Sequence, residues 1–447
     1  MRNTVLCLTV LLAAVASAQW LETTIQLPDS SWPNGLFYVP AVNKVYSADW
    51  SANRVSAIDG ATNTITATIP TAADAAYLCY NSQNNKVYCT HYEPGTVTVI
   101  DAAVDTVLTT IGAGHRANGI CYNPLNNKVY IPSSTRDSVY IVDGASDTVI
   151  TAVPAGDMPR FLCYNSQENK VYCSSFASDD VTVIDGPTDS VVATVAVGDQ
   201  PSTLFYCAAT GRVYCPNRGE GSLSVIDGVT DSVIATVAVG TSPRAVSYNQ
   251  AHNRLYCANS GSDNVTVIDG TTNGVLATVT AGDAPFMPLS NSVNDKVYCS
   301  NSASGDVTII DAAADSVLTT ISCGAYASEM VHNPAQNRVY VLNMDGWSIS
   351  VIRDSVPPGV EEAVNDEHGT MSAGPTIVRG VLMLPRDMAE SRSAISDRVP
   401  RPSLLDIAGR KALDLRPGAN DVRRLVPGVY FVREAQAQAV RKIIKLK

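Results

Sequence analysis

The amino-acid sequence predicts an all-β fold: an eight-bladed β-propeller followed by a small C-terminal β-sandwich. Two repeated features carry this prediction. Residues 44–46 read Lys-Val-Tyr, and this triplet returns every 42 residues with conservative changes, placing its tyrosine at Tyr46, Tyr88, Tyr130, Tyr172, Tyr214, Tyr256, Tyr298 and Tyr340. An aspartate that ends an apolar run keeps the same interval, at Asp59, Asp101, Asp143, Asp185, Asp227, Asp269 and Asp311. A fixed period of this length identifies a repeat architecture.

Each repeat unit contains four short β-prone runs. In the second unit these are residues 76–80, 86–90, 96–100 and 106–111, separated by turns rich in Asn, Asp, Gly and Pro. Such a pattern predicts an antiparallel meander of four strands. The 3.6-residue apolar period of helical repeats is missing, so the unit is expected to be a propeller blade.

The two ends of the repeat predict how the ring closes. The eighth unit supplies three strands, but Arg353 replaces the turn aspartate and Pro357-Pro358 follow where a fourth strand would begin. Residues 23–28 lie one period before residues 65–70, the fourth strand of the first unit. We therefore expect the N-terminal strand to complete the last blade.

The repeated polar residues are expected to serve the fold. Asp followed by a small residue is typical of a turn in which the carboxylate accepts local backbone N–H groups. We expect this role for the seven aspartates above, rather than a ring of cation ligands. A second residue of the turn is given the same role, at Asn63, Asp105, Asp147, Asp189, Asp231, Asn273 and Asp315. The repeated tyrosines are expected to pack between blades with their hydroxyls satisfied nearby.

Composition divides the chain into segments. Met1 to Ala18 resembles a secretory signal peptide in its charged start, apolar run and small-residue end. Residues 19–353 form the propeller, and residues 354–374 read as a polar linker. The net charge of −11 is uneven: residues 1–353 hold 30 Asp and Glu against 16 Lys and Arg, whereas residues 354–447 hold 12 against 15. The acidic propeller argues against nucleic-acid binding.

Eleven cysteines follow the repeat rather than a disulfide pattern. Cys79, Cys121 and Cys163 share one position of the unit, and Cys89, Cys173, Cys215, Cys257 and Cys299 share another. Both positions lie inside expected strands, where a free thiol serves as a small core residue. A bond between neighbouring strands, as from Cys79 to Cys89, would be strained.

Two family resemblances add to this interpretation. The blade motif Asn-Lys-Val-Tyr, Val-Thr-Val-Ile-Asp-Gly and Ala-Thr-Val-Ala-Val-Gly, seen within residues 169–198, resembles the YVTN-type β-propeller repeat. That family implies an exported or surface protein. Residues 375–447 resemble a C-terminal sorting domain of the type IX secretion system, which implies a partner in that machinery and delivery to the cell surface. The residues that carry this resemblance are Gly409, Arg410, Lys411, Pro427, Gly428, Tyr430, Lys445 and Lys447.

Residues that depart from the repeat pattern are the candidates for a function specific to this protein. His115, Arg116, Arg160 and Arg244 all fall in the link between the fourth strand of one blade and the first strand of the next. Because the first strands surround the central channel, the arginines could lie together at one channel mouth. Two interpretations stay open: the arginines are isolated and solvated, or they bind an anionic ligand there.

No metal or cofactor site is predicted, although oxygen-rich turns such as residues 178–180 leave calcium open. The strict 42-residue step leaves no room for pocket-building insertions, so the chain is not expected to be an enzyme. The preferred function is an exported binding scaffold for a surface protein or glycan. Two alternatives stay open: an extracellular enzyme or electron-transfer protein with a site at the channel mouth, and a structural surface-layer subunit.

Overall fold

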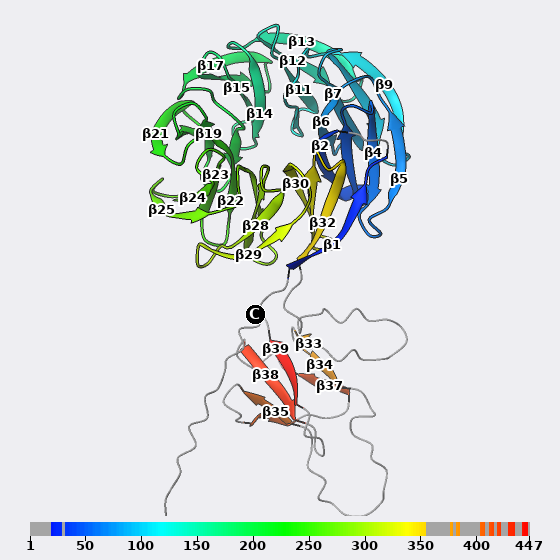
Figure 1. Ribbon diagram of the computed structural model, residues 1–447, viewed down its shortest axis with the longest axis vertical. Coiled ribbons are helices and arrows are strands. Elements are labelled where there is room, and N and C mark those ends of the chain that lie inside the picture. The colour runs from blue at the N-terminus through cyan, green and yellow to red at the C-terminus, as the bar shows by residue number, and fades with distance from the viewer. Residues whose placement is uncertain are drawn as a thin grey trace, which may run out of the picture. The chain divides into compact units, whose positions relative to one another are not determined.

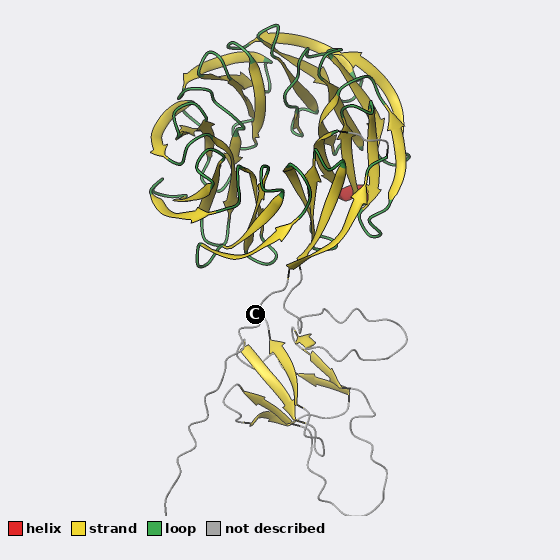
Figure 2. Cartoon of the chain, viewed as in Figure 1, coloured by secondary structure: helices red, strands yellow, loops and turns green. Residues whose placement is uncertain are grey.

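The computed structural model describes residues 19–28, residues 32–354 and, further on, the strands β33 to β39. Eight four-stranded antiparallel sheets form a ring with their first strands toward its centre (Figure 1). The predicted eight-bladed propeller is therefore confirmed. Strands make up almost all of the regular structure, as Figure 2 shows, apart from a short 3-10 helix, η1 (Pro40–Val42).

Each blade uses four strands in chain order. Blade 1 consists of β2 (Pro33–Val39), β3 (Lys44–Asp49), β4 (Arg54–Asp59) and β5 (Ile65–Pro70). Blade 2 consists of β6 (Ala75–Asn81), β7 (Lys86–His91), β8 (Thr96–Asp101) and β9 (Thr106–Gly112). Blade 3 consists of β10 (Cys121–Asn123), β11 (Lys128–Ser133), β12 (Ser138–Asp143) and β13 (Thr148–Pro154). Blade 4 consists of β14 (Pro159–Asn165), β15 (Lys170–Ser175), β16 (Asp180–Asp185) and β17 (Ser190–Ala196).

The other half of the ring repeats this order. Blade 5 consists of β18 (Phe205–Cys207), β19 (Arg212–Asn217), β20 (Ser222–Asp227) and β21 (Ser232–Ala238). Blade 6 consists of β22 (Pro243–Asn249), β23 (Arg254–Asn259), β24 (Asn264–Asp269) and β25 (Val275–Thr280). Blade 7 consists of β26 (Pro285–Asn291), β27 (Lys296–Asn301), β28 (Asp306–Asp311) and β29 (Ser316–Ser322).

Blade 8 joins the two ends of the ring. It consists of β30 (Ala327–Asn333), β31 (Arg338–Asn343), β32 (Ser348–Asp354) and the N-terminal strand β1 (Gln19–Gln26), in the order β1-β32-β31-β30. The predicted closure by the N-terminal strand is thus confirmed. Arg338 holds it in place through two hydrogen bonds to the Glu22 carboxylate, at 2.7 and 2.5 Å.

Burial explains the composition of the strands. The third strand of blade 2, Thr-Val-Thr-Val-Ile-Asp, is buried along its middle because neighbouring blades cover both of its faces. β-branched residues suit such a doubly covered strand. The fourth strand, β9, alternates between exposed and partly buried residues, since it forms the outer edge. The ten cysteines in the described part are free thiols, and eight of them are buried.

The turn aspartates behave as expected. Asp59 accepts the N–H groups of Ala61 and Thr62 at 3.0 and 2.7 Å, and the Thr62 bond lowers the pKa of the carboxyl. The second turn residue does more than the sequence predicted. In blade 2, Asp105 accepts Nζ of Lys44 at 2.6 Å and the hydroxyl of Tyr46 at 2.6 Å, both from blade 1. This residue is therefore an interblade acceptor, which corrects its assignment to the local turn alone.

The same contact recurs around the ring, and we call it the interblade tie. Tyr88 and Lys86 reach Asp147, and Tyr172 and Lys170 reach Asp231. Where the acceptor is Asn273, the donor is Arg212, which also reaches the carbonyls of Gly270 and Thr271. All eight repeated tyrosines are fully buried, so their packing between blades is confirmed.

The strands after residue 375 form a second unit. Five make one sheet in the order β33 (Thr376–Val378), β39 (Val440–Lys445), β38 (Gly428–Arg433), β35 (Ser403–Asp406) and β36 (Lys411–Asp414). β34 (Val381–Leu384) and β37 (Gly418–Asp421) pair separately. Of the expected sorting residues, Lys411, Gly428, Tyr430 and Lys445 lie on strands of the larger sheet. Gly409, Arg410, Pro427 and Lys447 lie outside the described residues, as do the expected signal peptide and linker.

Among the described residues, the structure contains no helix of the length and apolarity that a membrane crossing requires.

The interblade tie gives a first prediction. Asp147→Ala removes the carboxylate that accepts from the Lys86 ammonium and the Tyr88 hydroxyl, and leaves both donors only longer bonds to turn carbonyls, at a site where both charged side chains are largely buried. We expect a loss of about 3 kcal/mol in the free energy of unfolding, as for other broken buried pairs, measured by chemical denaturation. Asp147→Asn is the matched control, since asparagine fills this position as Asn63 and Asn273, and it should lose less than half as much. Equal losses in both variants would contradict the tie.

Candidate functional site

Three arginines of blades 4 to 6 gather on one face of the ring. Arg160 lies at the start of β14 and Arg244 at the start of β22, whereas Arg218 follows the end of β19. First strands begin and second strands end on this face, which we call the entry face. The guanidinium of Arg160 lies 3.7 Å from the ring centroid of Phe176, and that of Arg244 lies 4.2 Å from Phe286. The aromatic rings thus hold two guanidinium planes in fixed positions.

These arginines have no acidic partner. Within the described ranges, no carboxylate lies at ion-pair distance from Arg160, Arg218 or Arg244. The buried Nε of Arg160 has no hydrogen-bond partner. Burial lowers the pKa of both Arg160 and Arg244, and the charge of Arg218 lowers them further. Three uncompensated positive charges favour an anion at this place.

Glu329 supplies a carboxyl group on the innermost strand of blade 8. Its Oε2 accepts the N–H of Leu36 on β2 at 3.0 Å. The side chain is only partly exposed, and enclosure by the protein raises the pKa of the carboxyl to about 7, against the weaker opposing effect of the Leu36 bond. A carboxyl with this pKa can take up or release a proton near neutral pH.

The charges of the carboxyl and of two arginines all affect Tyr77. It lies on β6, and its ring packs edge-on against Phe161 with centroids 6.4 Å apart. Burial raises the pKa of its hydroxyl most, the Glu329 charge raises it further, and Arg160 and Arg244 oppose the rise. The three charged groups therefore act on one phenol. We call Tyr77, Arg160, Arg218, Arg244 and Glu329 the inner-rim cluster.

The structure places two of the four predicted site residues in the inner-rim cluster and two outside it. Arg160 and Arg244 belong to the inner-rim cluster. Arg116 is exposed and forms an ion pair with Glu93, 2.9 Å between Nη2 and Oε1. His115 contacts the Thr135 hydroxyl through Nδ1 at 3.1 Å, so its ring is not part of the cluster.

Sequence reasoning missed Glu329 and Tyr77. A signal for them existed in the repeat itself. Glu329 occupies a position where the other seven units carry Gly35, Tyr77, Gly119, Phe161, Thr203, Ala245 and Met287. It is the single ionisable carboxyl at an otherwise uncharged position, and such an exception marks a residue that the repeat does not need.

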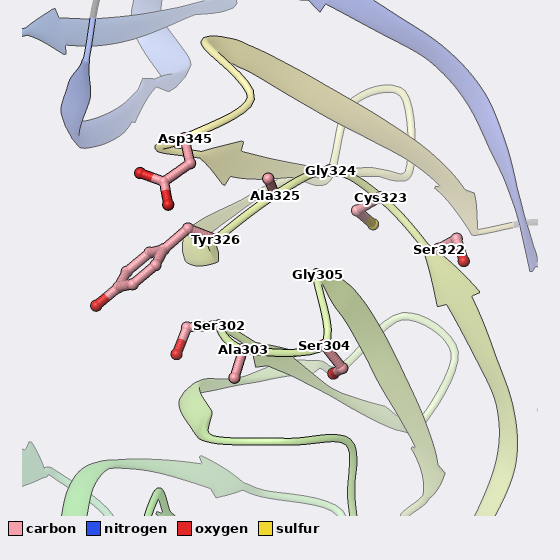
Figure 3. A pocket seen from close by; sticks show the side chains of 10 residues that line it. All are labelled: Ser302, Ala303, Ser304, Gly305, Ser322, Cys323, Gly324, Ala325, Tyr326 and Asp345. Atoms are coloured by element: carbon pink, nitrogen blue, oxygen red, sulfur yellow. The ribbon is translucent and has the colours of Figure 1, made fainter.

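An open groove lies on the entry face between blades 7 and 8 (Figure 3). Its volume is about 660 Å³, and its lining consists of residues 302–305, residues 322–326 and Asp345. Tyr326 and Asp345 lie at one end, and Ser322 and Cys323 lie at the other. The Tyr326 ring packs edge-on against Phe286, 6.4 Å between centroids, and Arg244 lies over the same Phe286 ring, so the groove adjoins the inner-rim cluster.

Across the described residues, His, Cys, Asp and Glu nowhere gather in a group of three or more that could hold a metal ion.

The raised pKa of Glu329 gives a second prediction. Because the carboxyl binds its proton more tightly in the folded state than in the unfolded state, stability falls as the pH rises from about 4.5 to about 7. Glu329→Gln removes this contribution, so its melting temperature relative to the wild type should increase between pH 5 and pH 8, as calorimetry can measure. Glu93→Gln, at an exposed carboxyl, should keep the wild-type dependence. A constant difference between Glu329→Gln and wild type across this range would rule out the raised pKa.

Comparison with solved structures supports the propeller arrangement. Sqt1 of Saccharomyces cerevisiae is 12% identical, with a TM-score of 0.64 over 74% of this chain and 99% of that one. Hydrazine synthase of Kuenenia stuttgartiensis is 15% identical, with a TM-score of 0.53 over 65% and 98%. The dihydro-heme d1 dehydrogenase NirN, in complex with DHE, is 13% identical, with a TM-score of 0.60 over 73% of each chain. Identities this low show the fold alone. No curated protein matches the sequence.

A family model described as "Lactonase, 7-bladed beta-propeller" matches residues 32–285, which is more than half of the chain. The matched region runs from the first strand of blade 1 to the start of blade 7, within a ring that here has eight blades. This match overturns the expectation that the protein is not an enzyme. That expectation assumed that a pocket needs insertions, whereas the inner-rim cluster is made by substitutions within the 42-residue unit. The chain belongs to the lactonase family of β-propellers.

Proposed function

We propose that this protein hydrolyses a lactone that carries a separate negative charge, with the inner-rim cluster as its site. The observation that supports the proposal most is the combination of three arginines without acidic partners and a carboxyl with a pKa of about 7. The arginines would bind the anionic group, and the carboxyl would manage the proton. The family supports the reaction class.

The hydrolysis needs only groups that the cluster contains. The Glu329 carboxylate takes a proton from a water molecule, and the water oxygen forms a bond to the lactone carbonyl carbon. The carbonyl electron pair moves to its oxygen, where a guanidinium stabilises the negative charge. The ring C–O bond then breaks, and the departing oxygen takes the proton from Glu329. The product is a hydroxy acid, whose atoms are those of the lactone plus one water molecule.

Tyr77 and the stacked aromatic rings position these groups. Phe176 and Phe286 fix two guanidinium planes, so the anion would meet preorganised donors rather than mobile side chains. Tyr77 is protonated at neutral pH, as an ordinary phenol is, and burial raises its pKa further. It can therefore donate a hydrogen bond to the substrate between the arginines and the carboxyl.

We also propose that the protein is exported. Support comes from the sequence, through the signal-peptide pattern of residues 1–18 and the resemblance of residues 375–447 to sorting tails. The machinery that reads such tails would then be a partner of the C-terminal segment.

Activity measurements give a third prediction. We expect hydrolysis of a γ-lactone with a ring carboxylate, and at least tenfold lower kcat/KM for unsubstituted γ-butyrolactone. Arg160→Met and Arg244→Met should each raise KM for the charged lactone about tenfold or more, because each removes a hydrogen-bond donor to the anionic group. The difference in kcat/KM between the two lactones should therefore become smaller. Arg136→Gln is the control, since Arg136 is exposed and contacts Tyr140 instead.

Glu329→Gln should lower kcat about a hundredfold or more while leaving KM nearly unchanged. In the wild type kcat/KM should rise with pH through about 7, because the carboxyl must be ionised to act as a base. Equal hydrolysis of both lactones, or full activity in Glu329→Gln, would contradict the proposed site.

A further inference from the structure

The groove between blades 7 and 8 lies where two positions of the repeat are both occupied by small residues. Ala325 stands where blades 4, 5 and 7 carry Asp157, Asp199 and Asp283. Ser302 stands where blades 1, 2 and 4 carry Trp50, Tyr92 and Phe176. Both replacements line the groove. Other junctions pair a small residue with a larger one, as Ala73 with Trp50 and Ser260 with Asp283. The hollow therefore accompanies the combination of two small residues at this junction.

A second replacement leaves a hydrogen-bond donor open in the groove. In blades 4, 6 and 7 the N–H at the position of Ala325 donates to a serine of the same blade, at 2.8 to 3.1 Å, namely Ser178, Ser262 and Ser304. In blade 8 that serine is Gly346, which has no side chain. No hydrogen bond within the described part of the chain uses the Ala325 N–H. A ligand can therefore take the place of the serine oxygen.

The remaining lining defines the chemistry of that ligand. Ser304 and Ser322 contribute exposed hydroxyls, and Asp345 contributes a carboxylate whose Oδ1 already accepts Nε1 of Trp32 at 2.9 Å. The lining contains no Lys or Arg, which disfavours an anion, and no large aliphatic side chain, which disfavours an apolar ligand. Tyr326 is 36% exposed at one end, and an aromatic ring with a polar edge suits the C–H face of a sugar.

We propose that this groove binds a neutral oligosaccharide. Its volume of about 660 Å³ lies in the usual range for ligand sites. Sugar hydroxyls would accept from the Ala325 N–H, donate to Asp345 and exchange hydrogen bonds with the serines, while one sugar ring packs on Tyr326. This site goes beyond the proposed hydrolysis and does not depend on it, since Glu329 is not part of the lining.

The test uses the full chain on a printed array of neutral and acidic glycans, followed by calorimetric titration with the strongest neutral one. Ala325→Asp places in the groove the side chain that three other blades carry at this position. Gly346→Ser restores the serine that accepts the N–H in three other blades. Because both changes follow the repeat, we expect folded protein, and each should weaken binding at least tenfold.

The controls separate this site from the inner-rim cluster. Ala145→Asp, an exposed change in a blade 3 turn, should bind as the wild type does. Glu329→Gln should bind glycan normally even where hydrolysis is lost. The proposal is overturned if folded wild type retains no neutral glycan, or if both groove variants bind unchanged. Binding of acidic glycans alone, abolished by Arg244→Met, would likewise overturn it and assign the ligand to the arginines.

Discussion

The interblade tie is the contact on which the ring depends. A blade alone has two apolar faces, and packing against its neighbours buries both, but apolar packing does not set the angle between neighbouring blades. The tie contributes to it, because a Tyr hydroxyl and a Lys of one blade reach the two carboxylate oxygens of one turn residue in the next, as Tyr46 and Lys44 do at Asp105. Lys donors meet an aspartate, as Lys170 meets Asp231. Arg212 instead donates to the neutral Asn273, and its guanidinium also donates to a turn carbonyl, that of Gly270.

All ties lie on one face of the ring, opposite the entry face. The Lys or Arg begins the second strand, and the acceptor lies in the turn after the third, at the same end of the sheet, where Lys86 pairs with Asp101. The other end, where Ala75 pairs with His91, carries no tie. Positions there vary from blade to blade without opening the ring. This separation explains how one strict repeat can hold a site made of unlike residues.

The same separation determines what could be predicted from the sequence. Blade number, strand positions and closure by the N-terminal strand follow from periodic residues such as Tyr46 and Asp59, because each position recurs with the same contact. Arg160 and Arg244 were chosen as candidates because they break the pattern. The grouping of these arginines with Tyr77 and Glu329 was not predicted. It brings together residues of blades 2, 4, 6 and 8, and the spacing of residues along the chain does not show which blades face one another. Asp105 lies in the turn as predicted, but its carboxylate accepts from the neighbouring blade rather than from local N–H groups. Sequence spacing could not show this, because its partners are 59 and 61 residues away.

Glu329 shows why a constant repeat length of 42 residues does not exclude a catalytic group. Its carboxyl needs enclosure to raise its pKa and a gap to hold its side chain, and the repeat supplies both without an insertion. Gly35, in the neighbouring blade, occupies the equivalent position, and a Cβ there would lie 2.2 Å from the Ala76 oxygen. Blade 1 therefore has no side chain at this position, and the N–H of the next residue, Leu36, donates to the Glu329 carboxylate. A single acidic substitution beside a required glycine is enough to place a proton-transfer group on an innermost strand of the ring, where its charge and those of Arg160 and Arg244 act on the same tyrosine, Tyr77.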